Sequence, residues 1–182
     1  TVTGKVTIAG NTQPGFAGLP LIELNGVGAA GPTTGLVLKA SGCVARSLVI
    51  NNFHGNGVLV FGSSSVVEGC FIGTNNGGVV SAGNQFHGVL IAGAATGVRV
   101  GSTTLGMGNV ISGNGLSGVA ILGSLASSNL VQGNFIGTNR FGTGSLGNAF
   151  DGVFISGGAK NNLIGGTVAN AGNLISANLS DG

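Results

Sequence analysis

Residues 71–75 read Phe-Ile-Gly-Thr-Asn, and the same five residues return at positions 135–139, which lie 64 residues later. The likeness extends outward in both directions. Residues 66–114 superpose on residues 130–178 at the same offset without a gap, and about half of the positions are identical. A fixed internal period is typical of repeat architectures, in which each unit stacks on its neighbour. The sequence therefore predicts a solenoid.

A shorter repeat lies within the long one, and it consists of a glycine followed by alternating aliphatic residues. Residues 88–91 (Gly-Val-Leu-Ile) are typical of this marker, and residues 5–8 (Lys-Val-Thr-Ile) look like its first member. Successive markers begin 22 to 34 residues apart, so the 64-residue unit contains two coils. We predict that Val89 and Ile91 point inward and that Leu90 contributes to an apolar outer face. The other markers are 35–38, 57–60, 118–121 and 152–155.

Further short strands follow each marker, such as residues 130–132 and 134–136 after the marker at 118–121. These segments are rich in β-branched residues and bounded by Gly, Asn or Ser, and no apolar period of 3.6 residues is present. One such coil cannot bury its aliphatic side chains alone, but stacked coils cover one another. We predict an all-β fold, a right-handed parallel β-helix of about six coils with three short strands per coil. Residues 1–182 form one domain, which we expect to be a fragment of a longer repeat protein.

Asparagine repeatedly follows glycine where the chain must turn sharply. Asn tolerates a left-handed backbone, and its amide bonds to nearby backbone groups. We predict that these amides stack at one position per coil and bond to the coils above and below. They are Asn84, Asn109, Asn134, Asn148 and Asn173.

Several phrases of the repeat resemble those of bacterial right-handed parallel β-helix repeat proteins of the pectate-lyase-like superfamily. They are Gly-Asn-Val-Ile-Ser-Gly-Asn (108–114), Gly-Asn-Phe-Ile-Gly-Thr-Asn (133–139), Asn-Asn-Leu-Ile-Gly-Gly-Thr (161–167) and Thr-Gln-Pro-Gly-Phe (12–16). The resemblance covers nearly the whole chain and implies the fold. It does not imply one activity, because that superfamily includes polysaccharide lyases, glycoside hydrolases, tailspikes, adhesins and repeat proteins without known activity.

Charged residues are rare in the chain, which contains six Lys and Arg and four Asp and Glu. No cluster of cations is present, so the composition argues against nucleic acid and against anionic membrane surfaces as partners. No apolar run approaches the length of a membrane span. The two cysteines, Cys43 and Cys70, do not define a disulfide framework, and the sequence leaves their redox state open.

The carboxylates are too few and too scattered for glycoside hydrolysis, which needs a pair about 5 to 10 Å apart. Glu68 and Asp151 should lie about three coils apart, so we expect that they do not meet. The resemblance implies clusters of Asp in hydrolases, and calcium-binding Asp with an Arg or Lys base in lyases, and neither set has a match here. The other two carboxylates are Glu23 and Asp181.

One column of residues has the composition of a catalytic triad. His87, Ser117 and Asp151 each stand directly before a marker, so we predict that they stack in three successive coils. In a working triad the histidine stands between serine and aspartate. Coil order instead puts Ser117 in the middle, with His87 and Asp151 about 10 Å apart. We interpret the column as polar side chains that face solvent.

The cations and histidines suggest no further site. Arg46, Arg99 and Arg140 are expected on different parts of different coils, and Arg99 as a lyase base lacks an evident carboxylate nearby. His54 and His87 could lie in adjacent coils, but two histidines without carboxylate or thiolate support rarely hold a metal. The sequence assigns no catalytic, cofactor-binding or metal-ligating residue. It therefore favours a role that is not enzymatic.

The leading hypothesis is a structural or interaction module of a secreted or cell-surface protein, such as a stalk or adhesin. The alternative is a carbohydrate-active domain that cleaves or binds extracellular polysaccharide. The chain has no Trp or Tyr for stacking on sugars, and we expect Phe71 and Phe135 to pack inside or against neighbouring turns. Candidate partners are polysaccharide or another surface protein, contacted by the protruding loops, and a second copy joined end to end through exposed terminal strands. The loops are 76–83, 103–108 and 140–147.

Overall fold

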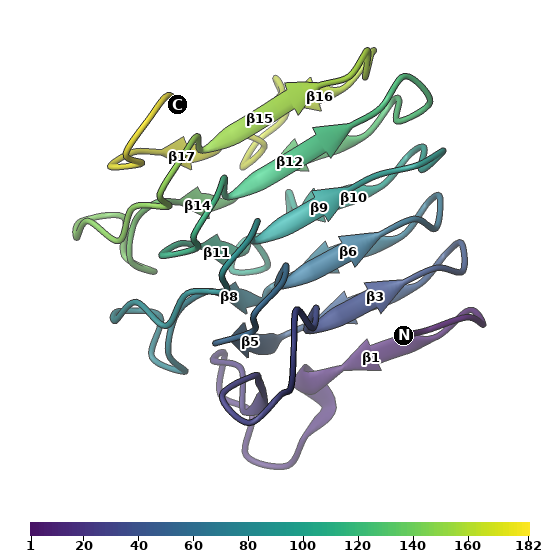
Figure 1. The fold of residues 1–182 in the computed structure, drawn as a ribbon. Coiled ribbons are helices and arrows are strands. Elements are labelled where there is room, and N and C mark those ends of the chain that lie inside the picture. Colours follow the sequence, from purple (N-terminus) through teal and green to yellow (C-terminus); the bar gives the residue numbers. More distant parts are fainter.

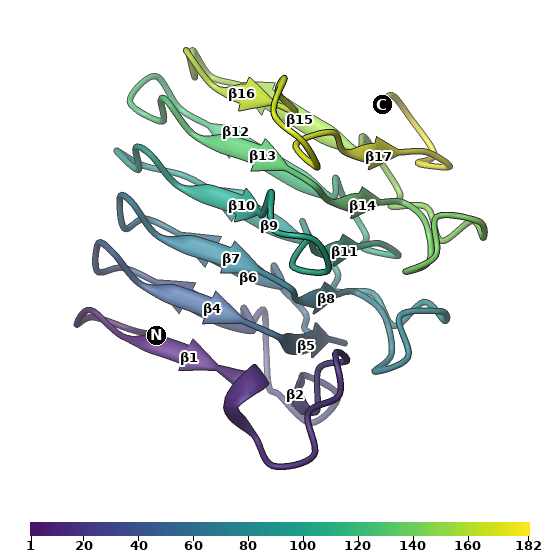
Figure 2. The same ribbon diagram turned by 180° about the vertical axis from the view of Figure 1, so that it is seen from behind.

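The structure is a computed structural model that describes all 182 residues as one stack of coils (Figures 1 and 2). Seventeen short strands form three parallel sheets of six, six and five strands, and each complete coil contributes one strand to each sheet. The only helix is the 3-10 turn η1 (Gly10–Thr12), and no helix is long and apolar enough to cross a membrane. The prediction of a right-handed parallel β-helix of about six coils is confirmed.

The three sheets run the length of the stack. Sheet A contains β3 (Leu36–Leu38), β6 (Val58–Val60), β9 (Val89–Ile91), β12 (Val119–Leu122) and β15 (Val153–Ser156). Sheet B contains β1 (Thr7–Ala9), β4 (Val44–Arg46), β7 (Val66–Glu68), β10 (Arg99–Gly101), β13 (Leu130–Gln132) and β16 (Leu163–Ile164). Sheet C contains β2 (Ile22–Asn25), β5 (Leu48–Asn51), β8 (Phe71–Ile72), β11 (Val110–Ile111), β14 (Phe135–Ile136) and β17 (Leu174–Ile175).

The markers line up in sheet A, where Val89 pairs with Val119. Their glycines are required by close packing between coils. A Cβ atom at Gly118 would lie 2.6 Å from Cγ2 of Ile136 and 2.8 Å from the carbonyl oxygen of Gly152 in the next coil. Because no side chain fits there, glycine stands before the strand in each marker.

The prediction for residues 5–8 is wrong. They lead into β1 of sheet B, where Thr7 pairs with Val44, and the place before β3 in sheet A is taken by a bridge between Val2 and Leu38. A three-residue alternating strand looks the same in every sheet, and residues 5–8 lack the glycine that distinguishes the markers.

The core lies inside the coils, as the alternation predicts. Val89, Ile91, Val119 and Ile121 are fully buried, and they belong to a cluster of 22 buried apolar residues. The equivalent Ile155 in the last coil is 41% exposed, because no further coil covers it. The outward neighbours in sheet A are partly exposed, except Ala120, whose small side chain is fully buried.

The asparagines stack as predicted but in three ladders rather than one. The amide Nδ2 of each member donates to Oδ1 of the asparagine in the next coil, at 2.9–3.0 Å. An asparagine after a glycine can occupy any of the three corners at which each coil turns. The sequence pattern therefore did not show which asparagines share a corner and stack in one ladder. The ladders are Asn84–Asn114–Asn148–Asn178, Asn109–Asn134–Asn173 and Asn129–Asn162.

Both cysteines are free and buried. Burial raises the pKa of the Cys70 thiol to about 12. The thiol of Cys70 is therefore neutral and unreactive at physiological pH.

Candidate binding groove

The outer face of sheet C carries a second apolar cluster, separate from the core. In each strand one residue points inward and the next points outward. Ile72 and Ile111 belong to the core, whereas their neighbours Phe71 and Val110 pair on the outside and pack together there. Phe135 continues the row in β14. This row forms the floor of a groove, and Phe71 and Phe135 pack against neighbouring turns, as predicted.

One wall of the groove is built by the repeated phrase Gly-Thr-Asn. After Asn75 and after Asn139 the chain makes a loop that an antiparallel bridge closes, between Thr74 and Ser81 and between Thr138 and Ser145. The Oδ1 atom of each asparagine accepts two backbone hydrogen bonds at 3.0–3.1 Å inside its loop. The backbone N–H of Arg140 donates to the carbonyl of Gly78 at 2.9 Å, so the two loops brace each other across the intervening coil.

The opposite wall consists of two loops that lead into β11 and β17. In the first, Thr104 N–H donates to Ser102 Oγ at 3.1 Å. The second is tied to the first, because Asn170 Nδ2 donates to the carbonyl of Thr103 at 3.1 Å. These two loops belong to the coils that lack a long loop in the first wall. In both walls, therefore, a long loop occurs in every second coil. Figures 1 and 2 show the long loops on the two sides of sheet C.

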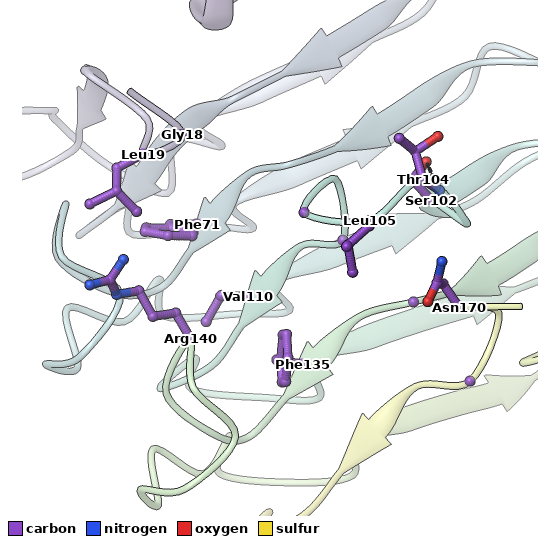
Figure 3. Close-up of a pocket in the computed structure, with 14 residues that line it drawn as sticks. Gly18, Leu19, Phe71, Ser102, Thr104, Leu105, Val110, Phe135, Arg140 and Asn170 are labelled. Carbon is purple, nitrogen blue, oxygen red and sulfur yellow. Dashed lines mark hydrogen bonds between the residues drawn. The ribbon is translucent and has the colours of Figure 1, made fainter. Parts of the chain in front are cut away.

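A pocket of about 330 Å³ lies between the walls, and Figure 3 shows its lining. The rings of Phe71 and Phe135 lie in the middle, with Val110 between them. In the same view Leu19 and Arg140 lie on one side of the rings, and Ser102, Thr104, Leu105 and Asn170 lie on the other. The pocket has an apolar floor and one charged residue in its walls.

An ion cluster supports the base of the second wall, and it corrects the expectation that Arg46 and Arg99 lie apart. Arg46 Nε donates to Glu68 Oε1 at 2.7 Å, and Arg99 Nη2 lies 3.1 Å from Glu68 Oε2. Arg99 Nη1 also donates to Ser102 Oγ at 3.2 Å. The three side chains meet because their strands, β4, β7 and β10, are adjacent in sheet B. The sequence showed no carboxylate near Arg99, but the structure places Glu68 beside it.

Glu68 has its two oxygens occupied by arginines and is 4% exposed. Each carboxylate oxygen is thus held against one arginine, which fixes the side chain in place. Through the hydrogen bond from Arg99 to Ser102, the cluster positions the loop that follows β10.

The column of His87, Ser117 and Asp151 stacks in three successive coils as predicted, with Ser117 in the middle. The interpretation that it faces solvent is wrong for Ser117, which is 3% exposed because the neighbouring coils cover its small side chain. Burial lowers the pKa of His87, and its Nδ1 atom is buried without a hydrogen-bond partner. No hydrogen bond joins the three side chains, so the column lacks the geometry of a triad.

The remaining sequence candidates stay apart. Asp151 stands directly before β15, more than two coils along the chain from Glu68 in β7, so the two carboxylates do not meet. Asp151 Oδ1 accepts the backbone N–H of Asp181 at 3.2 Å, and Glu23 Oε1 accepts from Asn51 Nδ2 at 2.8 Å. No group of three or more His, Cys, Asp or Glu side chains lies together. His54 and His87 are partly buried in adjacent coils.

The sequence found part of the groove. Two of the protruding loops, 103–108 and 140–147, contribute lining residues, and 76–83 supports the second through Gly78. The loop around Asn170 and Gly172 was missed, although the 64-residue offset from 103–108 leads directly to 167–172. Leu19 has no such signal, because its loop falls outside the repeat.

Comparison of the chain with protein-family models, with curated proteins and with solved structures finds no match. The groove must therefore be interpreted from its own geometry and chemistry.

Proposed function

We propose that this β-helix is a structural and interaction module of a secreted or cell-surface protein. Backbone hydrogen bonds between neighbouring strands tie the coils together along all three sheets, and the groove over sheet C provides a place for a partner. One observation carries the proposal: within each wall of the groove, two loops that lie two coils apart are joined by a hydrogen bond. Arg140 bonds to Gly78 in one wall, and Asn170 bonds to Thr103 in the other. Braced loops present a preformed surface, which lowers the entropic cost of binding.

The resemblance of the repeat phrases to the pectate-lyase-like superfamily supports an extracellular placement, as in stalks and adhesins of this kind. The buried, neutral thiol of Cys70 is compatible with an oxidising environment, because oxidation requires an accessible thiolate.

The alternative is a carbohydrate-active domain, and the aromatic floor is the feature that favours it. Phe71 and Phe135 lie two coils apart, about 10 Å. Phe71 is 7% exposed and Phe135 is partly buried, so a chain of sugars running along the groove could touch Phe135 but only a small part of the Phe71 ring. The groove lining contains no carboxylate. Binding of polysaccharide without cleavage therefore fits the groove better than hydrolysis, which needs two carboxyl groups.

A panel of soluble polysaccharides separates these roles. The chain is incubated with polygalacturonate, alginate, β-1,3-glucan and a soluble β-1,4-glucan, and binding is measured by affinity electrophoresis and cleavage by new reducing ends and absorbance of unsaturated products. The proposal predicts no cleavage. Cleavage of any polymer by the purified chain would replace it with the enzymatic role.

Two matched variants test whether any observed binding uses the groove. Gly172 lines the pocket and is exposed, and a side chain added there would meet no other atom within 4 Å of its Cβ. Gly4 is equally exposed and equally open, and it lies outside the pocket lining. Gly172→Trp should block binding, whereas Gly4→Trp should leave it unchanged. Equal binding by both variants would place the partner on another face.

A further inference from the structure

Arg140 is the one arginine of the chain without an ionic partner. Arg46 and Arg99 are both paired with Glu68. The Arg140 guanidinium makes no ion pair, its Nε atom is buried without a hydrogen-bond partner, and its Cζ lies 4.3 Å from the centre of the Phe141 ring. A partly desolvated guanidinium without a partner is costly, so an anion beside it would stabilise the site.

Arg140 is also the only charged residue in the pocket lining. No carboxylate of the chain can neutralise it, because Glu68 is held by two arginines and the other three acids lie outside the lining. The pocket therefore has a positive potential, which favours a ligand with one negative charge.

The pocket lining has three neutral polar side chains, Ser102, Thr104 and Asn170, and two of them help to hold the walls. Ser102 Oγ accepts from Arg99 and from Thr104 N–H, and Asn170 Nδ2 donates to Thr103. Few of them remain to pair with the many hydroxyl groups of a sugar, and unpaired hydroxyls would lose hydrogen bonds on binding. The floor is apolar, although Phe71 and Val110 are only 7% and 2% exposed, and the exposed Leu105 and the partly buried Leu19 add apolar surface on its two sides.

We propose that the pocket binds a small apolar carboxylic acid, with its carboxylate on the Arg140 guanidinium and its apolar body over Phe135, between Leu19 and Leu105. The planar guanidinium suits two parallel hydrogen bonds to a carboxylate. The volume of about 330 Å³ is near the lower end for small-molecule pockets. This assignment rests on the proposed role of the groove as a binding surface.

The test is calorimetric titration of the full chain at pH 7 with 4-phenylbutyrate and with its neutral amide, 4-phenylbutyramide. We expect the acid to bind at least about tenfold more tightly, the effect of a charge-assisted hydrogen bond. Arg140→Gln should remove that difference. Lys160→Gln, which removes an exposed cation elsewhere, should preserve it, and Gly172→Trp should abolish binding of both compounds.

Equal affinities for acid and amide, or an unchanged affinity for the acid in Arg140→Gln, would overturn the role of Arg140. Absence of binding by both compounds would overturn the whole assignment, and so would inorganic phosphate binding as tightly as phenylbutyrate. Thermal unfolding confirms that each variant is folded. The polysaccharide panel tests the groove independently of the carboxylic acid. If a polymer binds and Gly172→Trp abolishes that binding, the proposed interaction role is supported even when the acid does not bind.

Discussion

Glu68 shows how one residue links the core of the coil to its surface. Its carboxylate is almost completely buried, while the two arginines that neutralise it are about one-third exposed. Through Arg99 the same carboxylate reaches Ser102, which begins a wall of the groove. Loss of Glu68 should therefore affect both the stability of sheet B and the order of that wall.

Glu68→Gln is expected to lower the free energy of unfolding by about 2 kcal/mol, because two partly buried guanidinium groups lose their counter-charge. Urea denaturation at pH 7 measures the change. Glu23→Gln is the control, because Glu23 is exposed and bonds only to amides, and its effect should stay within about 0.5 kcal/mol. Equal effects of the two substitutions would contradict the importance of the cluster.

Because of Cys70, the free energy of unfolding is expected to depend on pH in the alkaline range. Its pKa is about 12 in the folded chain because of burial, against 9.0 for an ordinary thiol. The unfolded chain therefore releases this proton first, and stability that is complete below pH 9 should fall by up to about 1.4 kcal/mol per pH unit between pH 9 and 12. Urea midpoints measured across this range test the slope, and Cys70→Ala should flatten it. A slope unchanged in Cys70→Ala would assign it to other groups.

At the scale of structural elements, the asparagine ladders tie the coils together at their corners. Asn114 stands inside a ladder and is 1% exposed: its Oδ1 accepts from Asn84, and its Nδ2 donates to Asn148 and to the carbonyl of Ile72. Asn178 ends the same ladder and is less buried. Water can replace the bonds of an end member but not those of an interior one.

Asn114→Ala is therefore expected to destabilise the chain by about 2–4 kcal/mol, since several buried donors and acceptors lose their partners. Asn178→Ala should cost less than half as much. Thermal and urea unfolding of the two variants measure the difference. Equal costs would mean that the ladder acts through turn formation alone and not through stacking.

The sequence predicts strands and stacking well because both depend on local patterns. Alternating aliphatic residues after Gly88 or Gly118 specify which side chains enter the core, and the 64-residue offset specifies which coils are equivalent. The pairing of Arg99 with Glu68 was not predictable in this way, since the two residues differ in register and only the reach of the arginine joins them. The apolar floor of the groove was also missed, because Phe71 and Ile72 look alike in a buried strand until the direction of each side chain is known.

At the scale of the whole molecule, the two ends of the stack differ from its middle. The final coil exposes apolar side chains whose equivalents in earlier coils are buried: Ile155 is 41% exposed and Leu174 39%, whereas Ile121 and Val110 are 0% and 2% exposed. The strands of that coil also have unpaired edges, which readily join other strands.

We therefore predict that the chain of residues 1–182 associates end to end as its concentration rises. Multi-angle light scattering over a concentration series measures the mass. Ile155→Lys should suppress association by placing a charge on the exposed end of the stack, whereas Leu90→Lys, on the outer face of sheet A, should not. A constant monomer mass at high concentration would contradict the prediction.

The hydrogen bonds between loops of one wall also restrict how many coils can be inserted into the stack. Each wall of the groove recurs every second coil, with the loops on one side out of step with those on the other. Insertion of a single coil would break the contact between one pair of loops and leave a gap in that wall. Insertion of two coils would restore the phase on both sides, so the smallest extension that keeps the groove continuous is the 64-residue unit itself.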